Sequence, residues 1–118
     1  MPAAVSTIST EQLDQRLQQG GAFQFWNVLP DTYFRGELIV GSLRVPLETV
    51  GREARRLGLP KDAEIIVYCA DLACPLSGNA AEKLQELGYT NVRAYKGGLA
   101  EWKASGRPVA QLVTSGAA

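Results

Sequence analysis

The chain has 118 residues, enough for one domain that buries about two thirds of the surface its unfolded form exposes. Its 12 basic and 12 acidic residues give a formal net charge of zero without a basic run, so nucleic acids and anionic membranes are not expected partners. Histidine is absent, which excludes Cys/His and Ser/His catalytic pairs and removes the commonest metal ligand.

The expected elements alternate between helices and strands. The first half of the chain predicts a helix that begins after Ser9 and ends at Gly20-Gly21, a strand from Phe23 to Val28, an irregular connection from Tyr33 to Gly41, a strand from Leu43 to Val45, and a helix from Leu47 to Leu57. The second half predicts a strand from Glu64 to Tyr68, a helix capped by Ser77 and followed by Gly88, a strand from Val92 to Tyr95, and a short helix from Leu99 to Ser105. This order predicts an α/β fold, with about five strands in a mostly parallel sheet and helices on both faces.

Local signals support several of these elements. Ser9 followed by Gln12 is a capping box, and Ser77 is placed to cap the helix after the Cys69 loop. Gly97-Gly98 either shapes a binding edge beside this loop or is only a tight turn, and the tight turn is a sufficient interpretation. We interpret Trp102 as a core residue.

No targeting or membrane segment is expected. Met1 to Thr10 lacks the charged and apolar parts of a signal peptide, and no stretch approaches the roughly 18 apolar residues of a membrane span. The two cysteines are five positions apart, where a disulfide would close only a small loop. We therefore expect reduced thiols and a cytoplasmic location.

The most informative segment is the apolar run Ile65 to Tyr68, which ends in Cys69. Backbone N–H groups and a helix N-terminus converge beyond the carboxyl end of such a strand, and they favour an anion or a thiolate. Cys69 is therefore a candidate nucleophile that needs no imidazole base. The alternative is a buried, inert cysteine at the end of a strand.

The loop after this strand supplies the other candidate site residues. Cys74 is either a second reactive thiol with a resolving or relay role beside Cys69, or a small packing residue. The loop backbone is the expected substrate-binding surface, formed by Ala70, Asp71, Leu72, Ala73, Pro75, Leu76 and Ser77. Two thiols without histidine do not complete a structural zinc site, so we expect no metal.

Three segments resemble the rhodanese-like (sulfurtransferase) domain family. The family's C-terminal signature is similar to Gly97 to Trp102 together with Gly106 to Val109, and its N-terminal signature is similar to Asn27 to Pro46. The strand that carries the family's catalytic cysteine is similar to Val67 to Cys69. The resemblance implies a rhodanese-like domain over residues 9–109, between an N-terminal segment (1–8) and a loose C-terminal tail (110–118).

The resemblance also implies a function. A rhodanese-type sulfurtransferase moves sulfane sulfur from a donor such as thiosulfate or a persulfide to a thiol acceptor, through a cysteine persulfide. It implies Cys69 as the sulfur carrier, with Cys74 as the alternative, no cofactor, and a small sulfur donor and a thiol acceptor as partners.

The chain departs from the family pattern at charged positions. Asn27-Val28-Leu29 stands in place of the usual Asp-Val-Arg, Leu38 in place of a frequent histidine, and the loop holds Asp71 but no arginine. A carboxylate near Cys69 would raise the thiol pKa unless it points to water. These losses favour the alternative of a non-catalytic binding or regulatory module. Phosphatase or arsenate-reductase chemistry is not expected, because it needs an arginine clamp.

Overall fold

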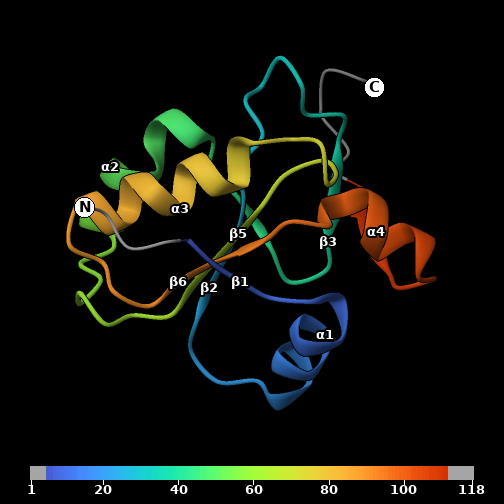
Figure 1. The fold of residues 1–118 in the computed structure, drawn as a ribbon, viewed down its shortest axis with the longest axis horizontal. Coiled ribbons are helices and arrows are strands. Elements are labelled where there is room, and N and C mark those ends of the chain that lie inside the picture. The colour runs from blue at the N-terminus through green and yellow to red at the C-terminus, as the bar shows by residue number, and fades with distance from the viewer. Residues whose placement is uncertain (1–4, 112–118) are drawn as a thin grey trace.

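The computed structural model describes residues 5–111 and has a five-stranded sheet at its centre (Figure 1). Every neighbouring pair in this sheet is parallel, in the order β1-β6-β5-β2-β4. The strands are β1 (Ser6–Thr7), β2 (Gln24–Asn27), β4 (Leu43–Arg44), β5 (Ile65–Tyr68) and β6 (Val92–Tyr95). The predicted α/β fold with a parallel sheet is therefore confirmed.

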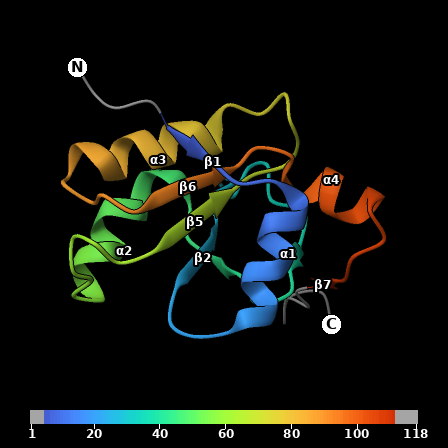
Figure 2. The ribbon, with the colours of Figure 1, turned by 60° about the horizontal axis from the view of Figure 1, so that its bottom comes forward.

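Helices cover both faces of the sheet, as Figure 2 shows. The first face packs against α2 (Val50–Arg56), which follows the 3-10 helix η1 (Leu47–Thr49), and against α3 (Leu76–Glu86). The second face packs against α1 (Thr10–Gln19) and α4 (Gly98–Ala104). Within residues 5–111, no helix is both long and apolar enough to span a membrane.

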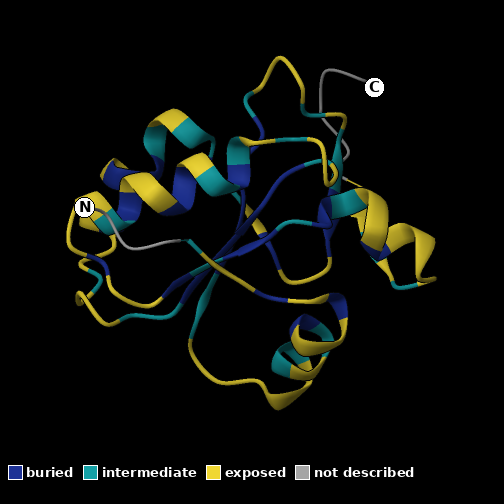
Figure 3. Cartoon of the chain, in the orientation of Figure 1, coloured by how far each residue is buried: buried dark blue, intermediate teal, exposed yellow. Residues whose placement is uncertain are grey.

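Strand β5 is buried on both faces because it lies in the middle of the sheet. Successive side chains alternate between the faces, so Ile65 and Val67 join the cluster under α2 and α3, whereas Ile66 and Tyr68 join the cluster under α1 and α4. Cys69 continues this alternation and belongs to the first cluster. Figure 3 shows the sheet as the buried layer between helices whose outer sides are exposed.

The predicted capping box at the start of α1 is confirmed. The Ser9 hydroxyl accepts a hydrogen bond from the Gln12 amide at 3.1 Å, and the Gln12 side chain accepts one from the Ser9 amide at 3.0 Å. Two backbone donors that the helix itself leaves free are thereby paired. The helix ends before Gly20, as the sequence predicts.

The expected irregular connection over residues 33–41 contains a strand, so that expectation was wrong. Strand β3 (Glu37–Ile39) pairs antiparallel with β7 (Val109–Gln111) in a separate two-stranded sheet. Strand β7 also takes up the first two residues of the predicted loose tail. This pairing joins segments about seventy residues apart, so a local sequence pattern does not predict strand β3. Residues 112–118 of the tail, and residues 1–4, lie outside the described residues.

The predicted cap of α3 was also wrong. The helix begins at Leu76, after Pro75, and Ser77 lies inside its first turn with its side chain fully buried. Proline suits a helix start because its φ is already close to the helical value and its missing N–H leaves no donor unpaired. Gly88 follows the end of α3 with φ 101°, as predicted for the residue after a helix.

Candidate active site

The candidate site lies where three neighbouring parallel strands end. Strands β6, β5 and β2 are adjacent in the sheet, so the segments that follow them meet at one edge. These segments are Val28-Leu29 after β2, Cys69 and its loop after β5, and Lys96 to Gly98 after β6. The three parts of the sequence that resemble the family signatures are thereby brought together.

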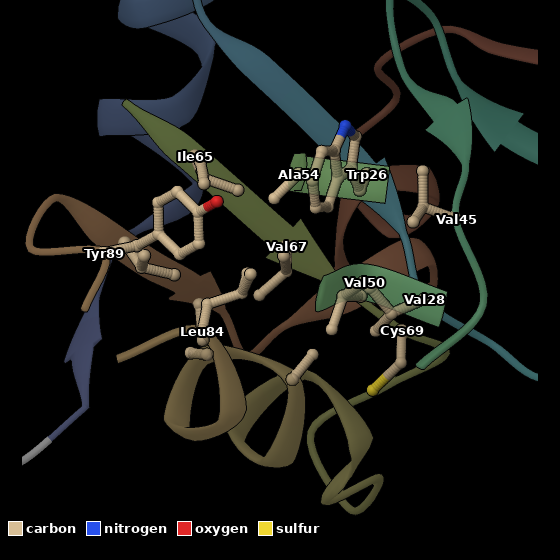
Figure 4. Close-up of a cluster of buried hydrophobic side chains, with 14 of the residues drawn as sticks. Trp26, Val28, Val45, Val50, Ala54, Ile65, Val67, Cys69, Leu84 and Tyr89 are labelled. Atoms are coloured by element: carbon tan, nitrogen blue, oxygen red, sulfur yellow. The ribbon is translucent and has the colours of Figure 1, made fainter. Parts of the chain in front are cut away.

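Cys69 is fully buried beside the start of α3. Its alternation with Val67 points the side chain to the face that α3 covers, and Figure 4 shows its sulfur at the end of the cluster, next to Val28 and Val50. The thiol donates a hydrogen bond to the backbone carbonyl of Cys74, with the sulfur 3.5 Å from the oxygen. Both cysteines are free thiols.

The first turn of α4 holds the beginning of the Cys69 loop. The amide of Leu99 donates to the carbonyl of Cys69 at 3.0 Å, and the amide of Ala100 donates to the carbonyl of Ala70 at 2.8 Å. A Cβ on Gly98 would lie 2.6 Å from the Cys69 carbonyl oxygen, so only glycine fits there. The Gly97-Gly98 turn therefore anchors the loop as well as turning the chain.

Asp71 shapes the loop rather than opposing the thiol. Its exposed carboxylate accepts a hydrogen bond from the Ala73 amide at 3.1 Å, and its carbonyl accepts one from the Cys74 amide at 3.1 Å. This is a local turn stabilised by an aspartate side chain. Asp71 is not among the groups that raise the Cys69 pKa. The Asp71 carboxylate therefore points to water, the condition under which it does not raise the Cys69 pKa.

The pKa of the Cys69 thiol is raised from 9.0 to about 11, mainly by burial and also by a hydrogen bond with the Cys74 side chain. The backbone N–H and the hydroxyl of Ser77 lower this pKa, because both stabilise the thiolate. The position at the helix start thus has the predicted effect, but burial outweighs it. At neutral pH Cys69 is a protonated thiol.

Ser77 is a polar group behind the buried thiol. Its side chain is 0% exposed, and its hydroxyl has no geometrically satisfactory hydrogen-bond partner among the described residues. Burying a hydroxyl without a hydrogen-bond partner costs free energy of folding. An anionic acceptor next to Ser77 would remove this cost. A thiolate at Cys69 would be such an acceptor.

A cleft of about 570 Å³ opens between the Cys69 loop and the segment after β2. Most of its wall is carbon, with one cation and one anion; the lining residues are Leu29, Tyr33, Arg35, Ala70, Asp71, Ala73, Cys74, Pro75 and Leu76. Half-buried Cys74 lines this cleft, whereas Cys69 does not. The two thiols of one loop therefore differ in their access to the cleft.

The structure brings most of the predicted binding residues together and separates two of them. Leu72 is 74% exposed and does not line the cleft, and Ser77 is buried behind the loop. The opposite wall, with Leu29, Tyr33 and Arg35, was not predicted as part of the site. These residues belong to the segment that is similar to the N-terminal family signature, which was the available clue in the sequence. Only the strand order shows that this segment faces the Cys69 loop.

Three cations from the segments around the site have different surroundings. Arg44 pairs with Asp31 at 2.6 Å and stacks on the ring of Phe34 at 4.0 Å, so its charge is already engaged. Arg35 lines the cleft. The ammonium of Lys96 lies over the first turn of α3, 2.8 Å from where a Cβ would stand on Gly78.

Comparison with known families finds one match over most of the chain. The sequence pattern of the rhodanese-like domain family matches residues 9–105. No curated protein matches this chain.

Solved structures give the same fold. The Alr3790 protein from Anabaena sp. superimposes with a TM-score of 0.79 at 30% identity, covering 92% of this chain and 95% of that one. A second structure, of the rhodanese-like domain of the same protein, gives 0.77 at 30% identity, with 92% and 81% covered. A thiosulfate sulfurtransferase from Pseudomonas aeruginosa gives 0.78 at 21% identity, covering 93% of this chain and 21% of the other, a likeness of fold alone.

Proposed function

The chain belongs to the rhodanese-like domain family, and from this we propose that it is a sulfurtransferase. It moves sulfane sulfur from a donor such as thiosulfate or a persulfide to a thiol acceptor, through a cysteine persulfide. The observation that carries the proposal is a free cysteine at the carboxyl end of β5, beside the start of α3, with a second free thiol in the same loop.

The chemistry uses the loop without an imidazole base. A cysteine thiolate attacks the outer sulfur of the donor, a new S–S bond forms, and the donor leaves as a thiolate or as sulfite. An acceptor thiolate then attacks the outer sulfur of the persulfide and restores the cysteine. The N–H and hydroxyl of Ser77 favour an anionic sulfur at the end of β5.

We assign the sulfur chemistry to Cys69 and Cys74, and substrate binding to the loop that joins them. The reaction needs no cofactor, and its partners are a small sulfur donor and a thiol acceptor that is a small molecule or a protein. We place it in the cytoplasm, a compartment that keeps thiols reduced; the two free cysteines support this.

A second candidate function is a non-catalytic binding or regulatory module. The observation that favours it is the state of Cys69, which is fully buried with its pKa raised to about 11. Leu29 also stands where the family usually has an arginine, so one charge that would attract an anionic donor is missing.

Sulfur loading distinguishes the two functions. The protein is incubated separately with thiosulfate and with cysteine hydropersulfide, and its intact mass is measured. A sulfurtransferase gains one sulfur atom, and cyanide then removes it as thiocyanate. The variant with both Cys69→Ala and Cys74→Ala is the control and gains none. Wild-type protein whose mass stays unchanged with both donors contradicts the enzyme and supports the binding module.

A further inference from the structure

The two cysteines of the loop differ in exposure and in their access to the cleft, although both contact the same core cluster. Cys69 is 0% exposed, belongs to the core cluster under α3, and lies outside the cleft wall. Cys74 is half-buried and forms part of that wall. A molecule in the cleft therefore meets the second cysteine of the loop and not the first.

We propose that Cys74 is the thiol that takes sulfur from the substrate, and that the donor is a small organic hydropersulfide bound in the cleft beside it. This inference rests on the proposed sulfur transfer and reverses the roles expected from the family resemblance. Cys69 is then a buried neighbour that positions Cys74.

The loop geometry supports this division of roles. The Cys69 thiol donates to the Cys74 carbonyl at 3.5 Å, and the Cys74 amide donates to the Asp71 carbonyl at 3.1 Å. Both backbone groups of Cys74 are thus held, and the residue lines the cleft while it also packs against the cluster that contains Cys69. The raised pKa of Cys69 agrees with this, since a protonated thiol is a poor nucleophile.

The cleft wall favours a donor that contains carbon over an inorganic dianion. Tyr33 and Leu76 offer apolar surface beside the nearly buried Leu29, and Arg35 is the one cation among the lining residues. Thiosulfate carries two charges and would lose hydration against such a wall with a single cation to replace it. An organic hydropersulfide would bury its carbon chain there, and a donor that carries a carboxylate would pair it with Arg35.

The transfer balances without an external oxidant or reductant. The Cys74 thiolate attacks the outer sulfur of the hydropersulfide R–S–SH and forms a Cys74 S–S bond. The S–S bond of the donor breaks, and the donor leaves as the thiolate R–S⁻. The proton stays with the transferred sulfur or passes to water, because Cys74 borders an open cleft.

Alkylation of the unloaded protein tests the difference in access without any sulfur transfer. Brief treatment with iodoacetamide at neutral pH, followed by fragmentation of the peptide that contains both cysteines, gives the order of modification. We expect Cys74 to react at least about tenfold faster than Cys69. Faster modification of Cys69 would overturn the assignment.

Single variants test which thiol is loaded. With cysteine hydropersulfide, Cys69→Ala is expected to gain one sulfur on Cys74, whereas Cys74→Ala loads at least about tenfold more slowly. Far-ultraviolet circular dichroism checks that both variants fold. Wild type that gains no sulfur contradicts the proposed function, whereas loading that requires Cys69 but not Cys74 overturns only this inference.

The donor class is tested at Arg35. Arg35→Gln should raise the KM for cysteine hydropersulfide about tenfold and leave the KM for an alkyl hydropersulfide without a carboxylate unchanged. Arg52→Gln removes an exposed arginine of α2 that does not line the cleft, and serves as the matched control. An equal effect of both substitutions, or faster wild-type turnover of thiosulfate than of either hydropersulfide, would overturn the donor assignment.

Discussion

Gly98 lies so close to Cys69 that a Cβ on the glycine would stand 2.6 Å from the cysteine carbonyl oxygen. That oxygen also accepts the hydrogen bond of the next residue, Leu99, at 3.0 Å. The contact joins the start of α4 to the strand end that carries the thiol. The loop is therefore anchored by backbone atoms, while its side chains remain available to the cleft.

Gly98→Ala should loosen this anchor and destabilise the protein. The substitution places a Cβ against backbone atoms that cannot move aside, and it adds the cost of a φ of +64°. We expect the free energy of unfolding in urea to fall by at least about 3 kcal/mol, and iodoacetamide to reach Cys69 faster.

Gly106→Ala is the matched control. Gly106 has a φ of +79°, and nothing lies within 4 Å of where its Cβ would stand. It therefore carries the backbone cost of about 1–2 kcal/mol without the steric contact. Equal losses in the two variants would show that the contact with Cys69 contributes nothing.

Alkaline stability should report the buried thiol. The Cys69 pKa is raised in the fold from 9.0 to about 11, so the folded state binds the proton more tightly than the unfolded state. Its contribution is complete below pH 9.0 and is lost as the pH rises through about 11. The total loss is of the order of 2 kcal/mol, measured by urea unfolding across this range.

Cys69→Ala isolates this contribution. Burial also raises the pKa values of Tyr68 and Tyr95, so both proteins lose stability at alkaline pH for a shared reason. The wild type should lose more than the variant by the amount assigned to Cys69. Parallel stability curves would contradict the raised thiol pKa.

Local patterns predicted four of the five strands of the main sheet, whereas the two-residue strand β1 (Ser6–Thr7) was not predicted. The run Ile65 to Tyr68 is continuously apolar, which is typical of a central parallel strand buried on both faces. The Ser9 capping box marks the start of α1. The same alternation that buries this strand also assigns Cys69 to the α3 face. That consequence depends on which helix covers which face, so it appears only in the folded chain.

The remaining features depend on contacts between distant segments. Strand β3 exists because β7 pairs with it and because the Tyr68 hydroxyl accepts the Ile39 amide at 2.9 Å. The local sequence predicts Ser77 as a helix cap. Because the helix begins at Leu76, directly after Pro75, Ser77 lies in its first turn and its side chain is buried. The wall with Tyr33 and Arg35 becomes part of the site only through the adjacency of β2 and β5.

Asp71→Asn should leave the reactivity of both cysteines unchanged. The exposed carboxylate bonds to the Ala73 amide and does not shift the Cys69 pKa, and an asparagine oxygen accepts the same hydrogen bond. Asp71→Ala removes that bond and should destabilise the loop by about 1 kcal/mol. Iodoacetamide labelling across pH checks both. A faster reaction in the asparagine variant would show that the carboxylate faces a thiol.

Leu29→Arg should change the preference for donors. Leu29 lines the cleft and stands where the family usually has an arginine, so the substitution adds a cation to a carbon-rich wall. We expect kcat/KM for thiosulfate to rise about tenfold relative to that for an organic hydropersulfide. Leu29→Met keeps the wall apolar and is the control. An unchanged ratio would show that the missing charge does not limit the use of thiosulfate.

Release of sulfide from loaded protein should depend steeply on pH. If Cys74 carries the persulfide, the thiolate of Cys69 attacks its inner sulfur, forms the Cys69–Cys74 disulfide and expels HS⁻. Attack within one short loop has a high effective concentration, but it needs a Cys69 thiolate, and the pKa of this group is about 11. The persulfide is therefore stable at neutral pH, and release becomes faster as the pH rises towards the thiol pKa. Sulfide assay with non-reducing mass spectrometry measures both products, and loaded Cys69→Ala should release none by this route. Release that is equally fast at neutral and alkaline pH would contradict a buried, protonated Cys69 as the attacking group.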